Sequence, residues 1–170
     1  MPVFCQKYVL SEPYPELRGI TADKSAAARV FPLYSGPSGE LSAVCTYFYY
    51  RSRLSAQRFQ ELSDLFACVS FDEMHHLELL SDLILALGGD PKFVINNRGH
   101  KMWWNAGFVS YLQDPKEMLR ESARGEHAAA AEYHRVARTL TGSARELLMR
   151  IARDEAHHAE LFEAALGRLK

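Results

Sequence analysis

The sequence has few cysteines, no long apolar run and almost no net charge, and each shortage excludes a class of protein. Its 170 residues include three cysteines, an odd number without a Cys-x-x-Cys pair, so a zinc ribbon, a rubredoxin-type iron site and a disulfide scaffold are not expected. The 20 Lys and Arg are balanced by 21 Asp and Glu, so the chain lacks the positive field that nucleic-acid binding needs. No apolar run approaches the roughly 18 residues of a membrane span, and residues 1–7 lack a signal-peptide layout. We therefore expect one globular, cytoplasmic domain with neither a nucleic-acid nor a membrane partner.

Proline is concentrated near the amino terminus. Five of the seven prolines lie within residues 1–37, so this stretch is predicted to be an irregular arm. A short helix over residues 24–30 is expected within it, after Asp23. Residues 38–170 are predicted to form the folded domain.

Four long helices are predicted in residues 38–170, because apolar residues recur there at spacings of three and four between proline and glycine breaks. Ser55 is the predicted N-cap of the second helix, and Asp114 followed by Pro115 opens the third. Ser143 and Glu146 form a predicted capping box for the fourth. The expected helices cover residues 38–54, 55–87, 115–140 and 143–167.

A linker of residues 88–114 joins the second and third helices, and it is too long for a hairpin turn. Its paired Trp103 and Trp104 are predicted to anchor it by burial. Two tight helical hairpins joined by one long crossover predict an all-α, ferritin-like four-helix bundle.

Two matching octapeptides carry the candidate chemistry. Residues 72–79 read DEMHHLEL and residues 154–161 read DEAHHAEL, with six of eight positions identical. A second pattern, Gly-Glu-x-x-Ala-x-x-x-Tyr, begins at Gly39 and again at Gly125. The chain therefore reads as two copies of one helical hairpin.

The repeats predict a dinuclear metal site. Each octapeptide contains Glu-x-x-His, a spacing that places a carboxylate and an imidazole on one helix face. Four carboxylates buried at one level would raise one another's pKa unless two divalent cations neutralise them. Mixed oxygen and nitrogen donors favour iron or manganese over calcium or magnesium. The predicted metal ligands, which are also the predicted catalytic residues, are Glu40, Glu73, His76, Glu126, Glu155 and His158. Glu73 and Glu155 are predicted to bridge the ions, and Glu40 and Glu126 to cap one ion each.

Two aspartates precede the ligand glutamates of the octapeptides. Each can accept the free N–H of the histidine on the paired helix, which would give the pairs Asp72–His158 and Asp154–His76 and would orient both rings. The alternative is that Asp72 and Asp154 are solvated on the helix faces.

Two tyrosines follow the capping glutamates. Tyr47 and Tyr133 stand seven residues after Glu40 and Glu126, about two helical turns along the same face. They are predicted to hydrogen-bond the carboxylates of the site, and core packing with a satisfied hydroxyl is the alternative.

The remaining histidines and the cysteines are not expected to bind the metal ions. Cys45 and Cys68 are predicted to be buried free thiols, with a redox disulfide between them as the alternative. Glu78 and Glu160 are expected to be solvated. The histidines predicted to lie outside the ligand sets are His75, His100, His127, His134 and His157.

At these motifs the chain resembles the rubrerythrin and bacterioferritin branch of the ferritin-like superfamily, over residues 39–167. The resemblance implies a non-haem di-iron centre, with manganese as the alternative metal, that reduces hydrogen peroxide or dioxygen with electrons from an external electron-transfer protein. The alternative functions are a ferroxidase or iron-handling protein, a manganese catalase, and a metal-stabilised structural protein.

The chain departs from the pattern of this family at several positions. The extra carboxylate of rubrerythrin is absent, since Ala123 and Ala129 flank Glu126, and so is its four-cysteine rubredoxin domain. Met74 stands where bacterioferritin has its haem-binding methionine, but packing at an interface is expected and haem is not. A bacterioferritin-type cage, which uses a short helix after the fourth, is not expected, and a homodimer is the expected assembly because two-fold pairs are the commonest.

Overall fold

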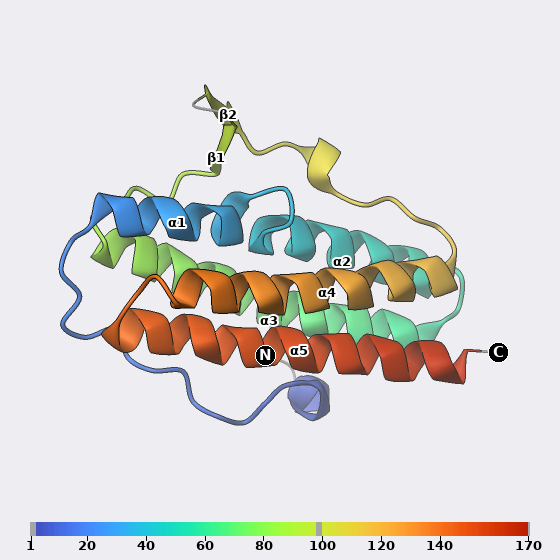
Figure 1. The fold of residues 1–170 in the computed structure, drawn as a ribbon. Helices are drawn as coiled ribbons and strands as arrows, with labels where there is room; N and C mark the ends of the chain where they lie inside the picture. The colour runs from blue at the N-terminus through green and yellow to red at the C-terminus, as the bar shows by residue number, and fades with distance from the viewer. Residues whose placement is uncertain (1–2, 98–99, 170) are drawn as a thin grey trace.

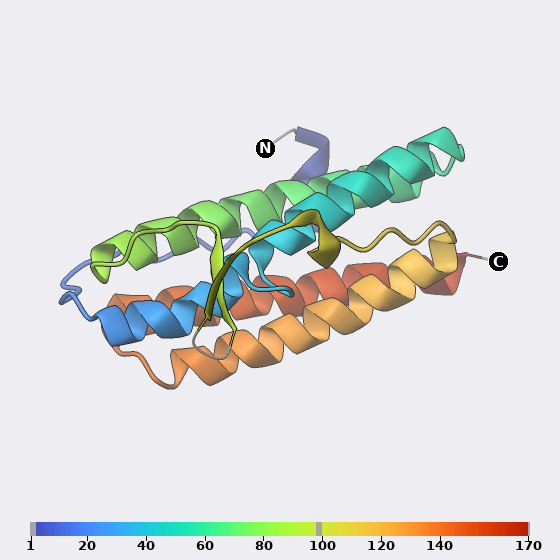
Figure 2. The same ribbon diagram turned by 90° about the horizontal axis from the view of Figure 1, so that it is seen from above.

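The structure, a computed structural model, describes residues 3–97 and 100–169. Four long helices lie side by side: α2 (Glu40–Ala56), α3 (Gln60–Ala86), α4 (Pro115–Ala137) and α5 (Gly142–Arg168) (Figure 1). α2 packs along α3, and α4 packs along α5, so the bundle consists of two antiparallel hairpins (Figure 2). The predicted all-α, ferritin-like four-helix bundle is confirmed.

The turn between α2 and α3 differs from the prediction. α2 continues through Ser55, and its last carbonyls are closed by a Schellman motif in which the Phe59 N–H donates to the Leu54 carbonyl at 2.9 Å. Arg58 occupies the left-handed position of that motif with a φ of 65°. The predicted N-cap at Ser55 is therefore wrong, because an arginine takes the place where glycine normally signals the end of a helix.

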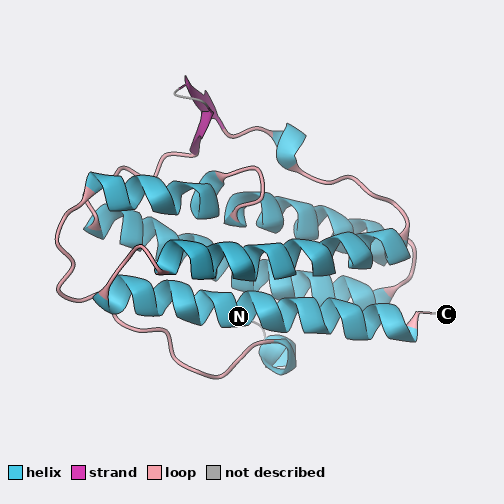
Figure 3. Cartoon of the chain, in the orientation of Figure 1, coloured by secondary structure: helices cyan, strands magenta, loops and turns pink. Residues whose placement is uncertain are grey.

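A further helix, α1 (Lys24–Ser35), lies almost in line with α2 and covers the part of α3 that α2 does not reach (Figure 3). The Asp23 carboxylate caps it by accepting the Ser25 N–H at 2.8 Å. The helix runs past the predicted end at residue 30 because Val30 and Leu33 are buried on its inner face. A Cβ on Gly39 would lie 2.5 Å from the Leu33 carbonyl oxygen, so a glycine is needed where the chain turns tightly from α1 into α2.

The rest of the amino-terminal arm is tied to the bundle on the opposite side from the crossover (Figure 1). Cys5, in the 3-10 helix Val3–Tyr8, forms a disulfide with Cys68 of α3, so the prediction that Cys68 is a free thiol is wrong. Cys45 is free. The Ser143 hydroxyl donates to the Arg18 carbonyl at 2.9 Å, so Ser143 holds the arm and does not form the predicted capping box.

The crossover carries a small hairpin that the sequence analysis did not predict. β1 (Val94–Asn97) pairs with β2 (His100–Trp103), and a short 3-10 helix (Ala106–Phe108) follows. The Trp104 indole N–H donates to the Ser42 hydroxyl at 2.9 Å, so Trp104 does anchor the crossover. Trp103 is 69% exposed, and its predicted burial is wrong.

The apolar core is divided into two clusters by a polar layer. One cluster, which includes Leu83 and Leu147, lies under α1, and the other, which includes Phe66 and Phe162, lies near the α2–α3 turn. Buried charged side chains occupy the layer between the two clusters. Within the described residues, no helix has the length and apolar character required to cross a membrane.

Candidate metal centre

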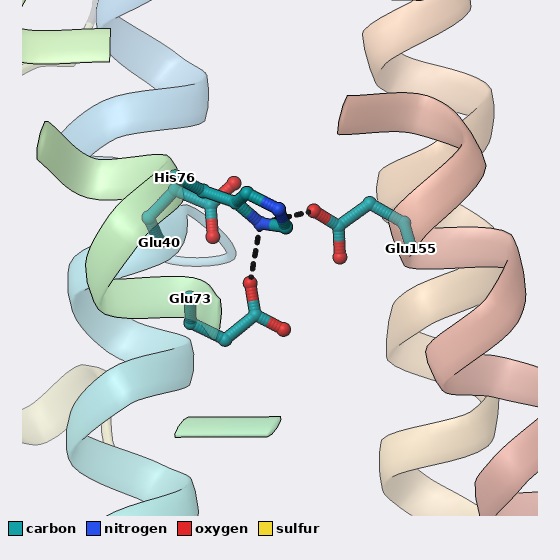
Figure 4. Close-up of side chains that lie close together, drawn as sticks. All are labelled: Glu40, Glu73, His76 and Glu155. Carbon is teal, nitrogen blue, oxygen red and sulfur yellow. Dashed lines mark hydrogen bonds and ion pairs between the residues drawn. The ribbon is translucent and has the colours of Figure 1, made fainter. Parts of the chain in front are cut away.

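All four bundle helices contribute buried charged side chains to the layer between the apolar clusters. Each of the six predicted ligands is at most 4% exposed. They fall into two groups whose candidate ligand atoms lie within 4.8 Å of one another. The first group is Glu40, Glu73, His76 and Glu155, shown in Figure 4, and the second is Glu73, Glu126, Glu155 and His158.

Glu73 and Glu155 belong to both groups, whereas each of the other four side chains belongs to one. We call a carboxylate private when it belongs to one group only. Each group therefore has the two shared carboxylates, one private carboxylate and one imidazole, and such a pair of groups can hold two bridged cations. The four carboxylates would balance the charge of two divalent ions. The geometry thus provides two shared and two private glutamates.

The histidines turn the same ring nitrogen toward the centre. His76 Nδ1 lies 3.1 Å from Glu73 Oε2 and 3.0 Å from Glu155 Oε1 (Figure 4). His158 Nδ1 lies 3.1 Å from Glu73 Oε1. Nδ1 is therefore the nitrogen available to a metal ion in both groups.

The second ring nitrogen of each histidine faces an aspartate across the bundle, on α3 for the histidine of α5 and on α5 for the histidine of α3. His158 Nε2 lies 3.2 Å from Asp72 Oδ2, and His76 Nε2 lies 3.4 Å from Asp154 Oδ2. An Nε2–H that donates to a carboxylate leaves Nδ1 unprotonated for a metal ion. The structure thus brings together both aspartate–histidine pairs that the octapeptides suggested.

The two tyrosines hold the private carboxylates from across the bundle. The Tyr47 hydroxyl of α2 donates to Glu126 of α4, and the Tyr133 hydroxyl of α4 donates to Glu40 of α2. Burial, together with the nearby carboxylates, raises the pKa of both phenols well above their ordinary value. Both hydroxyls therefore remain protonated donors at neutral pH.

Without a metal ion, the private carboxylates favour their neutral form. Burial is the main cause that raises the pKa of Glu40 and Glu126 well above the usual value, and the charges of Glu155 and Glu73 add to it. The pKa of Glu73 is lowered, because His158 and His76 together outweigh the opposite effect of burial. Glu73 is therefore ionised, whereas Glu40 and Glu126 favour their protonated form.

The histidines show the opposite balance. Burial by itself would lower their pKa, but the Glu155 charge beside His76 and the Glu73 charge beside His158 raise both pKa values well above the usual value. Protons thus provide the neutralising charge when metal ions do not. Bound cations would have to displace those protons.

Unsatisfied atoms at the middle of the layer fit a metal site. Glu73 Oε1, Glu155 Oε1 and His158 Nδ1 are inaccessible to solvent, and although each lies within 3.1 Å of a charged partner, none makes a hydrogen bond of good geometry within the described part of the chain. A buried acceptor without a partner is costly. Coordination to a cation would satisfy all three atoms, so the donor set fits iron or manganese.

Sequence reasoning missed two residues that contact the centre from outside. The Tyr14 hydroxyl donates to Asp154 at 3.0 Å and lies 3.2 Å from His76 Nε2. The Arg150 guanidinium pairs with Asp154 on the same helix. The four-residue spacing of Arg150 and Asp154 was a usable signal, but nothing marked Tyr14 within an irregular arm.

A cavity of about 670 Å³ between α2 and α4 reaches the carboxylates. Glu40, Glu126 and Glu155 are among the residues that line it, together with Gly125 and Ala129. Ala129 is one of the two alanines that flank Glu126 in place of the extra carboxylate of rubrerythrin. Its small side chain leaves this approach to the centre open.

The other residues singled out in the sequence lie outside both groups. His127 pairs with Glu163 at 2.9 Å, and His75 lies 3.4 Å from Glu78 on the exposed face of α3. Met74 is 49% exposed. Within the described residues, the two ligand groups also exclude His100, His134, His157 and Glu160.

Known proteins share both the sequence pattern and the fold. Residues 33–166 match the family model described as rubrerythrin. A probable manganese catalase from Clostridium acetobutylicum is 27% identical over 157 residues, which cover 79% of this chain and 67% of that protein. A manganese catalase from Anabaena superimposes with a TM-score of 0.75 at 21% identity, over 94% of this chain and 80% of that one. The bacterioferritin of Rhodobacter capsulatus gives 0.73 at 18% identity, over 86% of each chain.

Proposed function

The chain belongs to the rubrerythrin family, and from this premise we propose that it is an oxidoreductase that reduces hydrogen peroxide at a carboxylate-bridged di-iron centre. The proposed electron source is an external electron-transfer protein, and the proposed role is peroxide detoxification. The observation that carries the proposal is the pair of ligand groups that share Glu73 and Glu155. This arrangement holds two redox-active ions close enough to act on one small oxidant.

The residues of the chain would bind the ions and control the site around them. Two bound iron ions would supply the two electrons that cleavage of the O–O bond consumes. Tyr133 and Tyr47 each hold one oxygen of a private carboxylate and leave the other for ligation. The apolar clusters on both sides exclude bulk water from the site. Peroxide would reach the carboxylates through the cavity between α2 and α4.

A second candidate is disproportionation of peroxide without an external donor. Two observations favour it: the similarity to manganese catalases in sequence and fold, and the absence of an extra carboxylate at Ala129. In this case two manganese ions would occupy the same six ligands. A ferroxidase role remains a third proposal, and it is supported by the structural similarity to bacterioferritin.

One experiment separates these activities. Protein loaded anaerobically with Fe(II) or with Mn(II) is exposed separately to peroxide and to oxygen, with and without a reductant. Oxidation of the iron form by peroxide faster than by oxygen, with turnover that requires the reductant, would support the peroxidase. Oxygen evolution by the manganese form alone would identify a catalase, and uptake of many Fe(II) per chain with retained ferric product a ferroxidase.

The same experiment can contradict an enzymatic role. If neither oxidant changes the spectrum of the loaded protein, the ions serve only as a structural strut. Glu73→Gln should abolish the reaction because it removes a shared ligand. Glu78→Gln is the matched control on the same helix, since Glu78 is exposed.

The assembly and cellular location are also proposals. The exposed side chains of Phe71 and Met74 on α3 offer an apolar surface on which two copies could form the proposed homodimer. Met74→Glu should then shift the sedimentation of the protein toward that of a monomer. A cytoplasmic location stays a prediction, and the Cys5–Cys68 disulfide counts against it because such bonds are uncommon there.

A further inference from the structure

The two halves of the centre are not equivalent outside the ligand groups. Asp154 contacts His76 and also receives the Arg150 guanidinium and the Tyr14 hydroxyl. Asp72 occupies the corresponding place beside His158. The position one turn before Asp72 is a cysteine in a disulfide, whereas the position one turn before Asp154 is Arg150. Both copies of the repeat therefore contain the aspartate, but the side chains around the two aspartates differ.

Tyr14 is held in place from three sides. Its ring stacks over Arg150, with 4.5 Å between the guanidinium carbon and the ring centroid. Arg150 Nε and Nη2 donate to the Glu12 carbonyl oxygen of the arm at 3.1 and 2.8 Å. The His75 ring meets the edge of the Tyr14 ring at a centroid distance of 5.0 Å. These contacts fix the phenol hydroxyl beside Asp154 and His76.

We propose that Tyr14 is a positioning residue for the metal centre, which acts on the imidazole of His76 both directly, from 3.2 Å, and through Asp154. The hydroxyl donates to Asp154 Oδ2, the same oxygen that faces His76 Nε2. Fixing this oxygen fixes the orientation of the ring and directs Nδ1 toward the position that His76 shares with Glu40. The amino-terminal arm thereby distinguishes one metal position from the other.

This inference rests on the proposed metal site and adds an inequality between its halves. His158 relies on Asp72, which interacts electrostatically with the nearby Tyr14 but, within the described residues, receives no hydrogen bond or ion pair from the arm or from Arg150. We therefore expect the His76 position to bind its ion more tightly than the His158 position. Partners of metal-bound histidines typically change metal affinity about 10- to 100-fold.

Cobalt(II), added alone under anaerobic conditions, tests the inequality through its visible absorption. The wild type should fill two positions in separate steps. Glu40→Gln should remove the tighter step, because Glu40 is private to the His76 group. Tyr14→Phe should weaken that same step roughly tenfold, shift its absorption bands and leave the weaker step unchanged. Tyr8→Phe, in the same arm but away from the centre, should leave both steps as in the wild type.

The outcomes separate this inference from the site on which it rests. If Tyr14→Phe binds cobalt with the affinities and spectrum of the wild type, while Glu73→Gln loses both ions, the role of Tyr14 is refuted and the site stands. If Glu73→Gln still binds two ions, the ligand assignment itself fails. Equal weakening of both steps by Tyr14→Phe would show a general effect on the fold and would also refute the positioning role.

Discussion

At the scale of single residues, the centre depends on side chains that touch no metal ion but fix those that would. The aspartate pairs show why this matters, because each His must present an unprotonated Nδ1 to a space already crowded with carboxylates. Asp72 contacts His158 Nε2 at 3.2 Å. An amide at that position could offer its NH₂ group to the ring and favour the wrong tautomer.

Asp72→Asn is therefore expected to weaken metal binding at the His158 position about 10- to 100-fold, with the His76 position much less affected. Anaerobic titration with cobalt(II) measures both affinities. Asp82→Asn is the control, since Asp82 is exposed on the same helix. Unchanged affinity in Asp72→Asn would mean that the aspartate does not orient the ring.

A second residue-scale prediction concerns access through the cavity. Ala129→Leu would fill part of the space between α2 and α4 next to the carboxylates. We expect kcat/KM for peroxide to fall roughly tenfold, which corresponds to about 1.4 kcal/mol, while the metal content per chain stays at the wild-type value. Ala131→Leu adds the same bulk on the exposed face of α4 and should change neither quantity. Equal values of kcat/KM in Ala129→Leu and Ala131→Leu would mean that peroxide enters by another route.

The ligand set could be identified from the sequence because the ligand motif occurs twice in the chain. Two octapeptides with the same Glu-x-x-His spacing restrict one another, so the six side chains that the structure brings together could be named in advance. Tyr14 could not be named, because its place depends on the path of an arm without periodicity. Only the fold brings residue 14 to within 3.0 Å of residue 154.

At the scale of elements, the sequence predicted the helices better than the segments that join them. Apolar periodicity is repeated over many turns, and Asp114 before Pro115 marks the start of α4 as predicted, with the Asp114 carboxylate accepting the Glu117 N–H at 3.0 Å. A turn depends on one or two residues, so the arginine at position 58 was enough to move the boundary. The hairpin in the crossover could not be predicted in this way, because its strands lack an alternation of apolar and polar residues.

The disulfide between Cys5 and the α3 helix leads to a prediction about the arm. The bond links residues separated by 63 positions, and the chain-entropy model gives a stabilisation of about 4 kcal/mol for a loop of that length. Cys5→Ser should lower the melting temperature and expose residues 9–23 to proteolysis. Differential scanning calorimetry and limited proteolysis, both without reductant, measure the two effects.

Cys45→Ser is the matched control for this prediction, because Cys45 is free and half-buried. Adding a reductant to the wild type should reproduce the effect of Cys5→Ser and should not alter Cys5→Ser itself. Equal melting temperatures of wild type and Cys5→Ser without reductant would mean that the arm stays docked through Arg18, Glu12 and their partners alone.

At the scale of the whole molecule, the bundle carries a charged layer between two apolar clusters, and its stability depends on how that layer is neutralised. In the metal-free protein, protons on Glu40, Glu126 and both histidines provide the compensation, since all four have raised pKa values. In the loaded protein, cations would replace those protons. The two forms should therefore respond to pH in opposite directions.

The metal-free protein is expected to lose stability as the pH rises from about 5 to 8. A group whose pKa is raised on folding stabilises the native state at low pH, and this contribution disappears as the pH increases. Glu73 and Asp154 have lowered pKa values, so their contribution is already complete above their ordinary pKa and stays constant in this window. Burial lowers the pKa of His157, which gives the opposite slope, but this is one group against four. The net slope for the metal-free form is thus negative.

The loaded protein should become more stable over the same window, because metal binding releases protons and strengthens as their concentration falls. Urea unfolding at several pH values, with chelator or with a fixed excess of Mn(II), measures both slopes. Glu40→Gln should flatten the metal-free slope, since a neutral amide replaces one of the protonated acids. If the metal-free and loaded proteins showed the same rising stability, the four glutamates could not be relying on protons in one form and on cations in the other. The electrostatic reason for a metal pair in this layer would then be lost.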